Sequence, residues 1–498
     1  MYFIGFMDPN RDLEEKDRKI KHLIKATILS GISSVSNAIA LFVRNKIIAL
    51  SLGPYGVGLI SQLTNLSLVI SNFASVGINV GLIKYIAENL SNRKEKIHQI
   101  IVTGLKIIFV CTMVFTTFGI LFSKQISENL LDNKIYYALI IISFIGLPFL
   151  VLFNFYRSIF RGLLEIKKYI LAGIFNSFIT VIVLFPLIKL YHIKGAIWGM
   201  SIGYLISMIF IKSIIRKTNL FKIELNLFKG KIDTQIATNL IKFGFASLIA
   251  GTSTLVGLLF IRTVIVQRLD MVNAGYFQAI FAISSQSITL ILDSIGTYAY
   301  PFISSIKIKD NLIKELNNIM RLSMIITVPI ISGIILFKEN FIIILYSKEF
   351  LPIMKILPIQ LFGDFFKIIG WSMGVALLPL KRLKMFVFID LFVNLIFVGI
   401  SIMLIKNYGI KGICAGYLIS FIFHPIINYI YLKRTIGYNI EFKNIVTFMV
   451  SIVVLIISIL IKIDNFQKVV IYIILLMGLL ATLTKEEKLK IKSIIIRK

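Results

Sequence analysis

The sequence predicts an all-α integral membrane protein of about fourteen transmembrane helices, arranged as two parallel six-helix lobes around a central cavity with a C-terminal helix pair. Hydrophobic residues make up 57% of the 498 residues, and the mean hydropathy is +0.89. Soluble globular chains are nearer about 45–50% apolar. A water-soluble fold could not cover so much apolar surface with so few charged residues, so the expected solvent is lipid.

The apolar runs are long enough to cross a bilayer, which takes about 20 mostly apolar residues. The first six runs fall at 26–50, 58–82, 99–122, 136–157, 168–190 and 194–212. The next six fall at 243–266, 274–300, 321–340, 355–379, 384–405 and 412–432, and two more follow at 444–461 and 468–483. The segments between them are short, and GPYG at 53–56 and YGIKG at 408–412 are predicted to be tight turns.

The positive charge indicates which links face the cytoplasm. The net charge is +30, and the Lys and Arg residues gather in alternate links between the apolar runs. Cytoplasmic links carry this excess in membrane proteins, so both termini are predicted to be cytoplasmic. A basic soluble protein would suggest nucleic acid, but no basic helix stands apart from the apolar runs, so no nucleic-acid partner is expected.

An internal repeat divides the chain into two lobes. YHIKG at 191–195 and YGIKG at 408–412 each precede a helix that carries GYLIS, at 203–207 and 416–420. Each half holds six runs, so both halves run in the same direction and form a parallel repeat. The predicted boundaries are a cytoplasmic tail at 1–25, lobes at 26–217 and 243–437 joined by a linker at 218–242, an extra helix pair at 438–484 and a basic tail at 485–498.

Motifs for catalysis, metal binding or ATP hydrolysis are missing from the sequence. It contains no phosphate-binding G-x-x-x-x-G-K-[ST] loop. The four histidines have no metal-ligand spacing, and the two cysteines lie inside apolar runs. We therefore expect no cofactor, no metal and no enzymatic activity. Two similar six-helix lobes leave a central cleft that can open alternately to each side, which is typical of a transporter. The energy for such transport is expected to come from an ion gradient, from the substrate gradient or from metabolic removal of the product.

Charged residues inside the spans are the best candidates for function, because each costs roughly 2.5–3.5 kcal/mol near the centre of a membrane helix. Arg44 and Arg262 occupy similar places near the outer ends of the first helix of each half. Asp293 is the deepest carboxylate and a candidate for ion coupling. The remaining charges in the spans are Lys46, Lys106, Asp364, Lys367 and Asp390. For most of them, snorkelling to the surface or mutual neutralisation is an equally good interpretation.

The paired arginines suit an anionic ligand. Arginine presents a fork of N–H groups that matches phosphate oxygens, so one Arg from each lobe can hold a pyrophosphate where the lobes meet. A lipid tail attached to that group would remain in the bilayer, and an attached glycan would occupy the wet cavity. Polar side chains either line such a cavity or bond helix to helix, and the candidates are Asn37, Gln62, Asn65, Asn72 and Asn79.

Three segments resemble O-antigen translocases of the Wzx type: RNKIIALSLGPYGVGL at 44–59, GINVGLIKYIAE at 77–88 and QLFGDFFK at 360–367. The resemblance implies the polysaccharide-exporter fold of the multidrug/oligosaccharidyl-lipid/polysaccharide superfamily. It also implies a flippase of undecaprenyl-pyrophosphate-linked repeat units in the bacterial inner membrane, with membrane lipids and a polysaccharide polymerase as partners. The family's functional positions fall on Lys46, Lys84, Arg262, Asp364 and Lys367. Residues 444–483 extend the usual twelve spans, as in lipid-II-flippase-like members.

Two other functions remain open at this stage. An ion-coupled multidrug exporter shares the superfamily fold, but it would be expected to carry a carboxylate in its first helix, where this chain has Arg44 and Lys46. A polysaccharide polymerase or ligase would be expected to carry a long outer loop with catalytic groups, and the outer links here are short.

Overall fold

The structure is a computed structural model that describes residues 9–90, 94–216, 232–306, 308–461 and 465–483, and these residues form helices joined by short links. Side chains are described from residue 34 onward, apart from a few positions in α7 and α8. Most of the predicted linker and the basic C-terminal tail lie outside the described residues.

The first half of the chain forms α1 (Pro9–Ala74), α2 (Ile78–Glu88), α3 (Lys94–Leu121), α4 (Ser123–Leu131), η1 (Lys134–Tyr136), α5 (Tyr137–Gly162) and α6 (Ile166–Arg216). The second half forms α7 (Thr234–Arg268), α8 (Met271–Ser305), α9 (Lys309–Leu336), α10 (Lys338–Leu345), η3 (Lys348–Lys355), α11 (Leu357–Gly374), α12 (Leu383–Ile436), α13 (Phe442–Leu460) and α14 (Asn465–Ala481).

Three helices are long because each contains two spans joined at a single non-helical residue. These residues are Gly53 in α1 (φ 63°, ψ −167°), His192 in α6 (φ 50°, ψ −128°) and Gly409 in α12 (φ 56°, ψ −140°). Counting each arm separately, the chain makes about fourteen passes, as predicted. Seven of the described helices are long and apolar enough by themselves to cross a membrane. The turns predicted at 53–56 and 408–412 contain the observed breaks, but each break is one residue long, because the backbone leaves the helix at Gly53 or Gly409 and resumes at the next residue.

The second predicted span is also wrong in its boundaries. α1 ends at Ala74, and α2 begins at Ile78 after two residues with positive φ, Val76 (50°) and Gly77 (64°). The apolar pattern continues through this break, so hydropathy alone did not reveal it. Other helix ends follow from local chemistry: the Asp270 side chain accepts the Asn273 N–H at 2.6 Å to begin α8, and Gly437 in the left-handed region ends α12.

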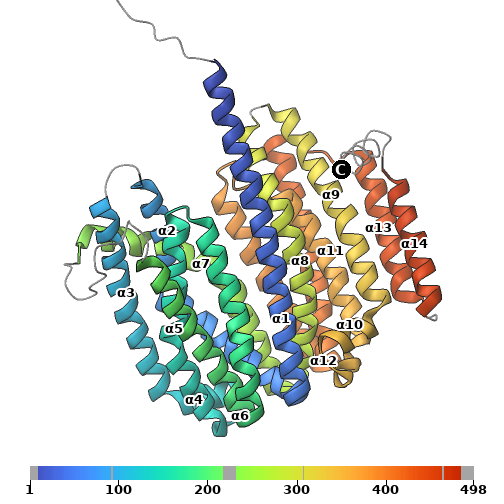
Figure 1. Cartoon of the computed structure of the whole chain (residues 1–498). Coiled ribbons are helices and arrows are strands. Elements are labelled where there is room, and N and C mark those ends of the chain that lie inside the picture. Colours follow the sequence, from blue (N-terminus) through green and yellow to red (C-terminus); the bar gives the residue numbers. More distant parts are fainter. Residues whose placement is uncertain (1–8, 91–93, 217–231, 307, 462–464, 484–498) are drawn as a thin grey trace, which may run out of the picture.

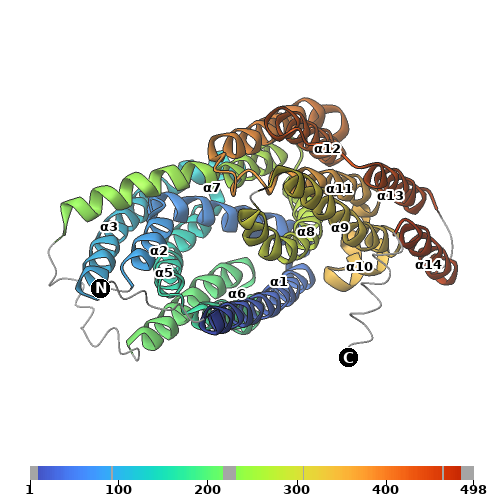
Figure 2. The same ribbon diagram turned by 90° about the horizontal axis from the view of Figure 1, so that it is seen from above.

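In sequence order, α1 to α6 form the first lobe and α7 to α12 the second. In space α7 runs beside α2 and α3 of the first lobe (Figure 2), and Figure 1 shows the two sets of helices side by side. The lobes touch where α1 packs against α7 and α8 and where α7 packs against α2. The last pair, α13 and α14, lies at the flank of the second lobe against α9. We call the end with Gly53, His192 and Gly409 the hinge end, and the opposite end, where α1 starts and α14 finishes, the terminal end (Figure 1).

The two lobes repeat each other at an offset of 217 residues, the difference between His192 and Gly409, whose backbone angles nearly match. A Cβ on Gly195 would lie 1.8 Å from the Leu187 carbonyl oxygen, and one on Gly412 would lie 2.6 Å from the Leu404 carbonyl oxygen, so both pairs show the same offset. Small residues thus let the second arm approach the first in each lobe. The GYLIS segments differ by 213 residues, one helical turn out of this register.

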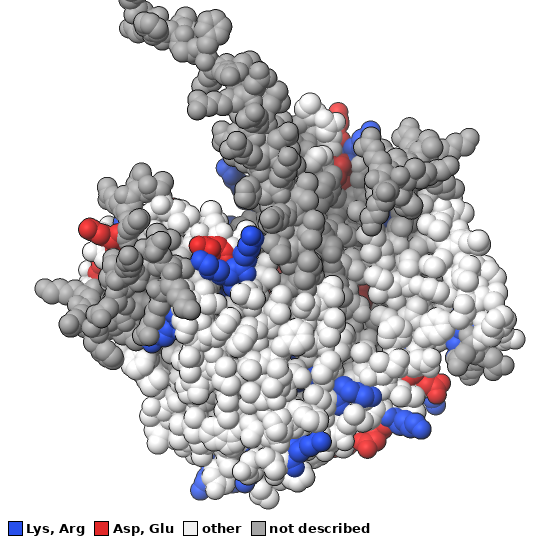
Figure 3. All heavy atoms as spheres, in the orientation of Figure 1, with Lys and Arg blue, Asp and Glu red and all other residues white. Residues whose placement is uncertain are grey.

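Short helices cover the hinge end. α4 and η1 link α3 to α5, and α10 and η3 link α9 to α11. Side chains of α7 and α8 bind the backbone of these links: Gln267 donates to the Asn129 carbonyl at 2.8 Å and Tyr276 to the Glu349 carbonyl at 3.2 Å. Charged atoms on the face in Figure 3 gather toward the two ends and leave a broad uncharged band between them, as expected for a protein that crosses the hydrocarbon core.

Candidate functional site: cavities within and between the lobes

A cavity of about 220 Å³ lies between the lobes, and it is lined by both predicted arginines. Arg44 enters it from the first arm of α1, and Arg262 enters it from α7. The described lining includes no carboxylate, and its other polar side chains are Asn45, Ser61, Thr64, Asn65, Gln278 and Ser285. The cavity is therefore cationic and rich in hydrogen-bonding groups.

Arg262 is held rigidly in the wall of this cavity. It is only 5% exposed, and it donates to the Ser61 carbonyl at 3.2 Å and to the Gln278 amide oxygen. Its guanidinium lies 5.9 Å from the centre of the Phe281 ring. Its buried Nε has no hydrogen-bond partner within the described protein. A buried N–H group without an acceptor costs free energy, so this N–H group is suited to bind an anionic ligand.

Arg44 has the same property from the other lobe. Its Nε is buried and has no protein acceptor within the described part of the chain, and no ion pair to a carboxylate is formed there. The next residue fixes this stretch of α1, because the Asn45 amide donates to the Tyr346 hydroxyl at 3.2 Å. The structure thus places on one cavity an arginine from each lobe, each with an unused N–H.

The other predicted cations lie away from this cavity. The Lys46 ammonium donates to the Ile343 carbonyl of α10 at 2.5 Å, at the hinge end. Lys84 is exposed on α2, 3.9 Å from Glu88, and its ammonium lies 4.5 Å from the centre of the Phe243 ring. Neither residue lines the cavity between the lobes.

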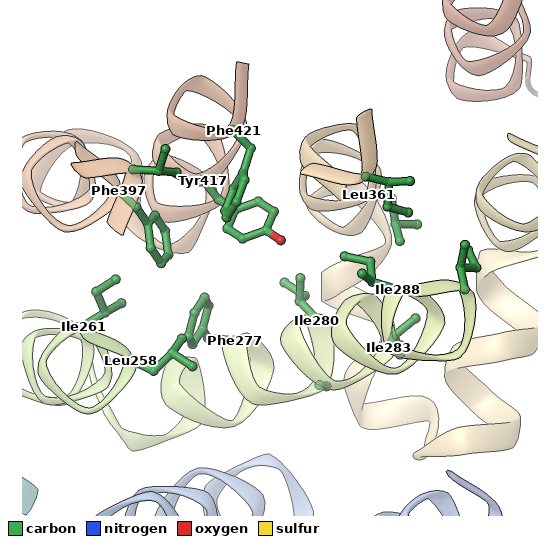
Figure 4. Packing of buried hydrophobic residues seen from close by; sticks show 14 of the residues in the cluster. Leu258, Ile261, Phe277, Ile280, Ile283, Ile288, Leu361, Phe397, Tyr417 and Phe421 are labelled. Carbon is green, nitrogen blue, oxygen red and sulfur yellow. The ribbon is translucent and has the colours of Figure 1, made fainter. Parts of the chain in front are cut away.

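A second cavity, of about 140 Å³, lies inside the second lobe and holds Lys367 and Asp390. The Lys367 ammonium lies 4.9 Å from the centre of the Phe421 ring. Asp364 is fully buried beside it, and its carboxylate accepts the Tyr417 hydroxyl at 2.8 Å. Figure 4 shows the Tyr417 ring among apolar side chains, including Phe421, with its hydroxyl directed away from α12. The side chain of Asp293, on α8, lies outside the described part of the structure.

A third cavity, of about 290 Å³, lies in the first lobe between α1, α5 and α6, and Gln286 of α8 completes its lining. Its polar lining includes Asn37, Ser143 and Asn176, and Arg44 is its only charged residue among those described. Arg44 lines this cavity and the one between the lobes, so the two are neighbours. Gln62, another predicted lining residue, instead donates to Thr263 at 2.9 Å and bonds the lobes together.

Comparison with known protein families decides which family carries this arrangement. The family described as polysaccharide biosynthesis protein matches residues 23–307, more than half of the chain. The protein belongs to the polysaccharide biosynthesis protein family. The matched region runs from residue 23 in α1 to the end of α8 and therefore includes both cavity arginines.

Among curated proteins, this family member is similar to the lipid III flippase of Escherichia coli (strain K12). The two are 21% identical over 400 residues, which cover 80% of this chain and 95% of the relative. A protein of the same name from Shigella flexneri shows the same identity and coverage.

Solved structures show the same fold. A multidrug resistance MATE family transporter of the MOP superfamily, in an inward-facing conformation, matches with a TM-score of 0.73 at 15% identity, covering 82% of this chain and 98% of that one. The lipid II flippase MurJ, in an inward closed conformation, matches with a TM-score of 0.69 at 17% identity, covering 91% and 97%. The polysaccharide biosynthesis family member is therefore a multi-pass membrane protein with a two-lobe transporter fold.

The sequence did not indicate one residue of the cavity between the lobes, Gln278, or one buried cation that lines none of the three cavities, Arg157. The Gln278 amide oxygen accepts a hydrogen bond from Arg262, but isolated glutamines in the apolar run 274–300 form no recognisable pattern. Arg157 on α5 lies 4.3 Å from the centre of the Tyr169 ring, and its buried Nε has no described protein partner. Arg157 ends the predicted span 136–157. At that position it resembles an ordinary cation that flanks a membrane helix, so the sequence gives no sign that it is buried.

Proposed function

We propose that the protein moves undecaprenyl-pyrophosphate-linked oligosaccharide repeat units, of O-antigen or a related surface polysaccharide, from the cytoplasmic to the outer leaflet of the bacterial inner membrane. Transport proceeds by alternating access between the two lobes. The hinge end then faces outward, and both termini are cytoplasmic, in agreement with the Lys and Arg bias. A polysaccharide polymerase uses the delivered units outside.

The observation that carries this proposal is the convergence of Arg44 and Arg262 on one cavity. The buried Nε–H groups of the two arginines have no acceptor in the described protein. A pyrophosphate supplies acceptor oxygens and a negative charge that complements the two guanidinium groups. The two arginines come from different lobes, so a shared ligand links their movements. The prenyl tail stays in the bilayer beside the uncharged band, because moving it into a polar cavity would lose its apolar contacts.

The remaining predicted residues take other parts in this proposal. Asp364, together with Asp293, couples transport to an ion gradient, since a buried carboxylate in a transporter is a natural proton or cation site. Lys367 acts in the second lobe, close to Asp364. Lys84 is positioned at the terminal end to meet anionic headgroups, and Lys46 anchors α10 at the hinge end.

An ion-coupled multidrug exporter is the alternative with the same fold. Cationic drugs need carboxylates or aromatic walls, and the described lining of the cavity between the lobes offers two arginines and no carboxylate. The similarity to the multidrug transporter supports the fold alone, at 15% identity. The cavity chemistry therefore favours the anionic substrate.

A reconstitution experiment tests the proposal. The purified protein is placed in liposomes with a fluorescent polyprenyl-pyrophosphate-linked oligosaccharide, and the fraction in each leaflet is followed with a membrane-impermeant quencher. Replacing Arg44 and Arg262 together with Ala should slow flipping at least about a hundredfold, since each lost charge-assisted contact contributes roughly 1.5–3 kcal/mol. Arg434→Ala, at an exposed arginine of α12, is the matched control and should flip normally. Normal flipping by the double variant would refute the proposal.

A further inference from the structure

We propose that the cavity inside the first lobe is a binding site for a neutral sugar ring, the one attached directly to the pyrophosphate. This inference rests on the proposed function and assigns the first lobe the recognition of the glycan. It follows from the chemistry of the cavity wall, from its connection to Arg44 and from its contrast with the cavity in the second lobe.

Four hydroxyl groups in the cavity wall donate their hydrogens to backbone carbonyls. Ser67 donates to the Leu63 carbonyl at 2.9 Å, and Ser143 donates to the Leu139 carbonyl at 2.8 Å, each four residues back on its own helix. Two threonines of the wall do the same: Thr64 donates to Ile60 at 2.7 Å and Thr180 to Asn176 at 2.7 Å. A hydroxyl has one hydrogen and two acceptor lone pairs, so these groups offer the cavity acceptors only.

An amide oxygen adds to this excess of acceptors. The Asn176 Oδ1 atom is buried and has no hydrogen-bond donor within the described protein, and Asn176 lines the cavity. The wall also carries donors, on Arg44 and Tyr204, so a ligand that fits must both donate and accept. Sugar hydroxyls do both, whereas the carboxylate of an acidic sugar only accepts and cannot bond to the serine and threonine hydroxyls or to the Asn176 Oδ1 atom.

The position of Arg44 sets which sugar is held. Because Arg44 lines both this cavity and the one between the lobes, a pyrophosphate on the two arginines has its first substituent at the mouth of the first-lobe cavity. The cavity volume of about 290 Å³ equals that of about ten water molecules at roughly 30 Å³ each. A space of this size suits one sugar ring and not a whole oligosaccharide repeat unit. The later sugars stay outside it.

The second lobe offers a different environment. Its cavity is about half as large, at about 140 Å³, and its lining carries the charged groups Lys367 and Asp390 together with His424. Charged side chains of both signs suit ion coupling better than a neutral ring. The two lobes therefore have different roles: the first binds the sugar, and the second holds the charged groups suited to ion coupling.

Binding measurements with three probes test the site. The probes are a short-chain prenyl pyrophosphate, the same lipid carrying one neutral hexose, and the same lipid carrying one uronic acid. Binding to the full-length protein in nanodiscs is measured by the change in tryptophan fluorescence or by calorimetry. We expect the neutral sugar to tighten binding at least about tenfold over the bare pyrophosphate, and the uronic acid to give no gain.

Matched variants locate the effect. The double variant Ser67→Ala/Ser143→Ala should lose the gain from the neutral sugar and should bind the bare pyrophosphate as the wild type does. The control Ser158→Ala/Ser213→Ala removes two hydroxyls that are also bonded four residues back, to Asn154 and Ile209, but that lie outside the cavity lining. The control should keep the gain.

The outcomes separate the two proposals. If bare pyrophosphate binds in an Arg44- and Arg262-dependent manner but the neutral sugar adds nothing, or the uronic acid adds as much, the sugar site is refuted and the proposed function stands. A gain that survives in Ser67→Ala/Ser143→Ala also refutes the site. If none of the three probes binds, the proposed function itself fails.

Discussion

Gly58 on α1 and Gly275 on α8 bring the two lobes together backbone to backbone near the hinge end. A Cβ on Gly58 would lie 2.2 Å from the Met271 carbonyl oxygen, and a Cβ on Gly275 would lie 1.9 Å from the Pro54 carbonyl oxygen. Neither distance is compatible with any side chain. The closed hinge end therefore depends on two glycines, and the cavity between the lobes lies next to this contact because Ser61, one turn on from Gly58, lines it.

Gly275→Val should force the hinge end open. A cysteine introduced at Thr263, which bonds Gln62 across the lobes, should then react at least about tenfold faster with a membrane-impermeant maleimide, in a background with Cys111 and Cys414 replaced. Gly399→Val is the control, because a Cβ at Gly399 meets nothing within 4 Å. Equal labelling of the two variants would contradict the role of the glycine contact.

Asp364→Asn should uncouple transport from an ion gradient. The substitution keeps the size of the side chain and its contact with the Tyr417 hydroxyl but removes the charge that a proton or cation would neutralise. Flipping rates in liposomes are compared with and without an imposed pH or sodium gradient, and the ratio should fall to unity. Asp270→Asn, at the exposed start of α8, serves as the control. A variant that keeps its response to the gradient rules out Asp364 as the coupling group.

Arg321→Met should detach the last helix pair. Arg321 is 2% exposed, and it donates to the Lys443 carbonyl at 3.0 Å, to Thr447 at 3.1 Å and to the Thr482 carbonyl. Removing these bonds should lower the free energy of unfolding by about 2–4 kcal/mol. Thermal unfolding in detergent and proteolysis around residue 440 would measure the effect. The exposed Arg434→Met should be neutral, and equal stability of the two variants would show that Arg321 does not hold the pair.

His192→Gly should stabilise the protein, and Gly409→His should destabilise it. Both positions have positive φ with ψ near −130°, a conformation that costs a non-glycine residue about 1–3 kcal/mol. His192 bears this strain in the native chain, whereas Gly409 avoids it. Apparent melting temperatures of the two variants should therefore move in opposite directions, and shifts of the same sign would count against the matched hinges.

The number of passes and the two-lobe fold were predictable, because apolar run length and the internal repeat indicate them. The shared cavity of Arg44 and Arg262 was only loosely indicated, because the 217-residue offset relates Arg44 to Ile261 and not to Arg262. Lys46 was grouped with Arg44, yet residues two apart on a helix point about 200° away from each other at 3.6 residues per turn. The two could not both face one cavity, and the structure directs Lys46 to α10. The partners of Arg262 are Ser61 and Gln278, which come from other helices, so their contacts depend on tertiary packing that no local pattern encodes.

The one-residue hinges have a mechanical consequence. Each hinge joins two membrane-crossing arms through a single residue: Gly53, His192 or Gly409. The two arms of each pair therefore cannot separate at the hinge end. If the hinge end faces outward as proposed, a protease added to intact cells should cleave none of these three hinges, because each offers a single non-helical residue.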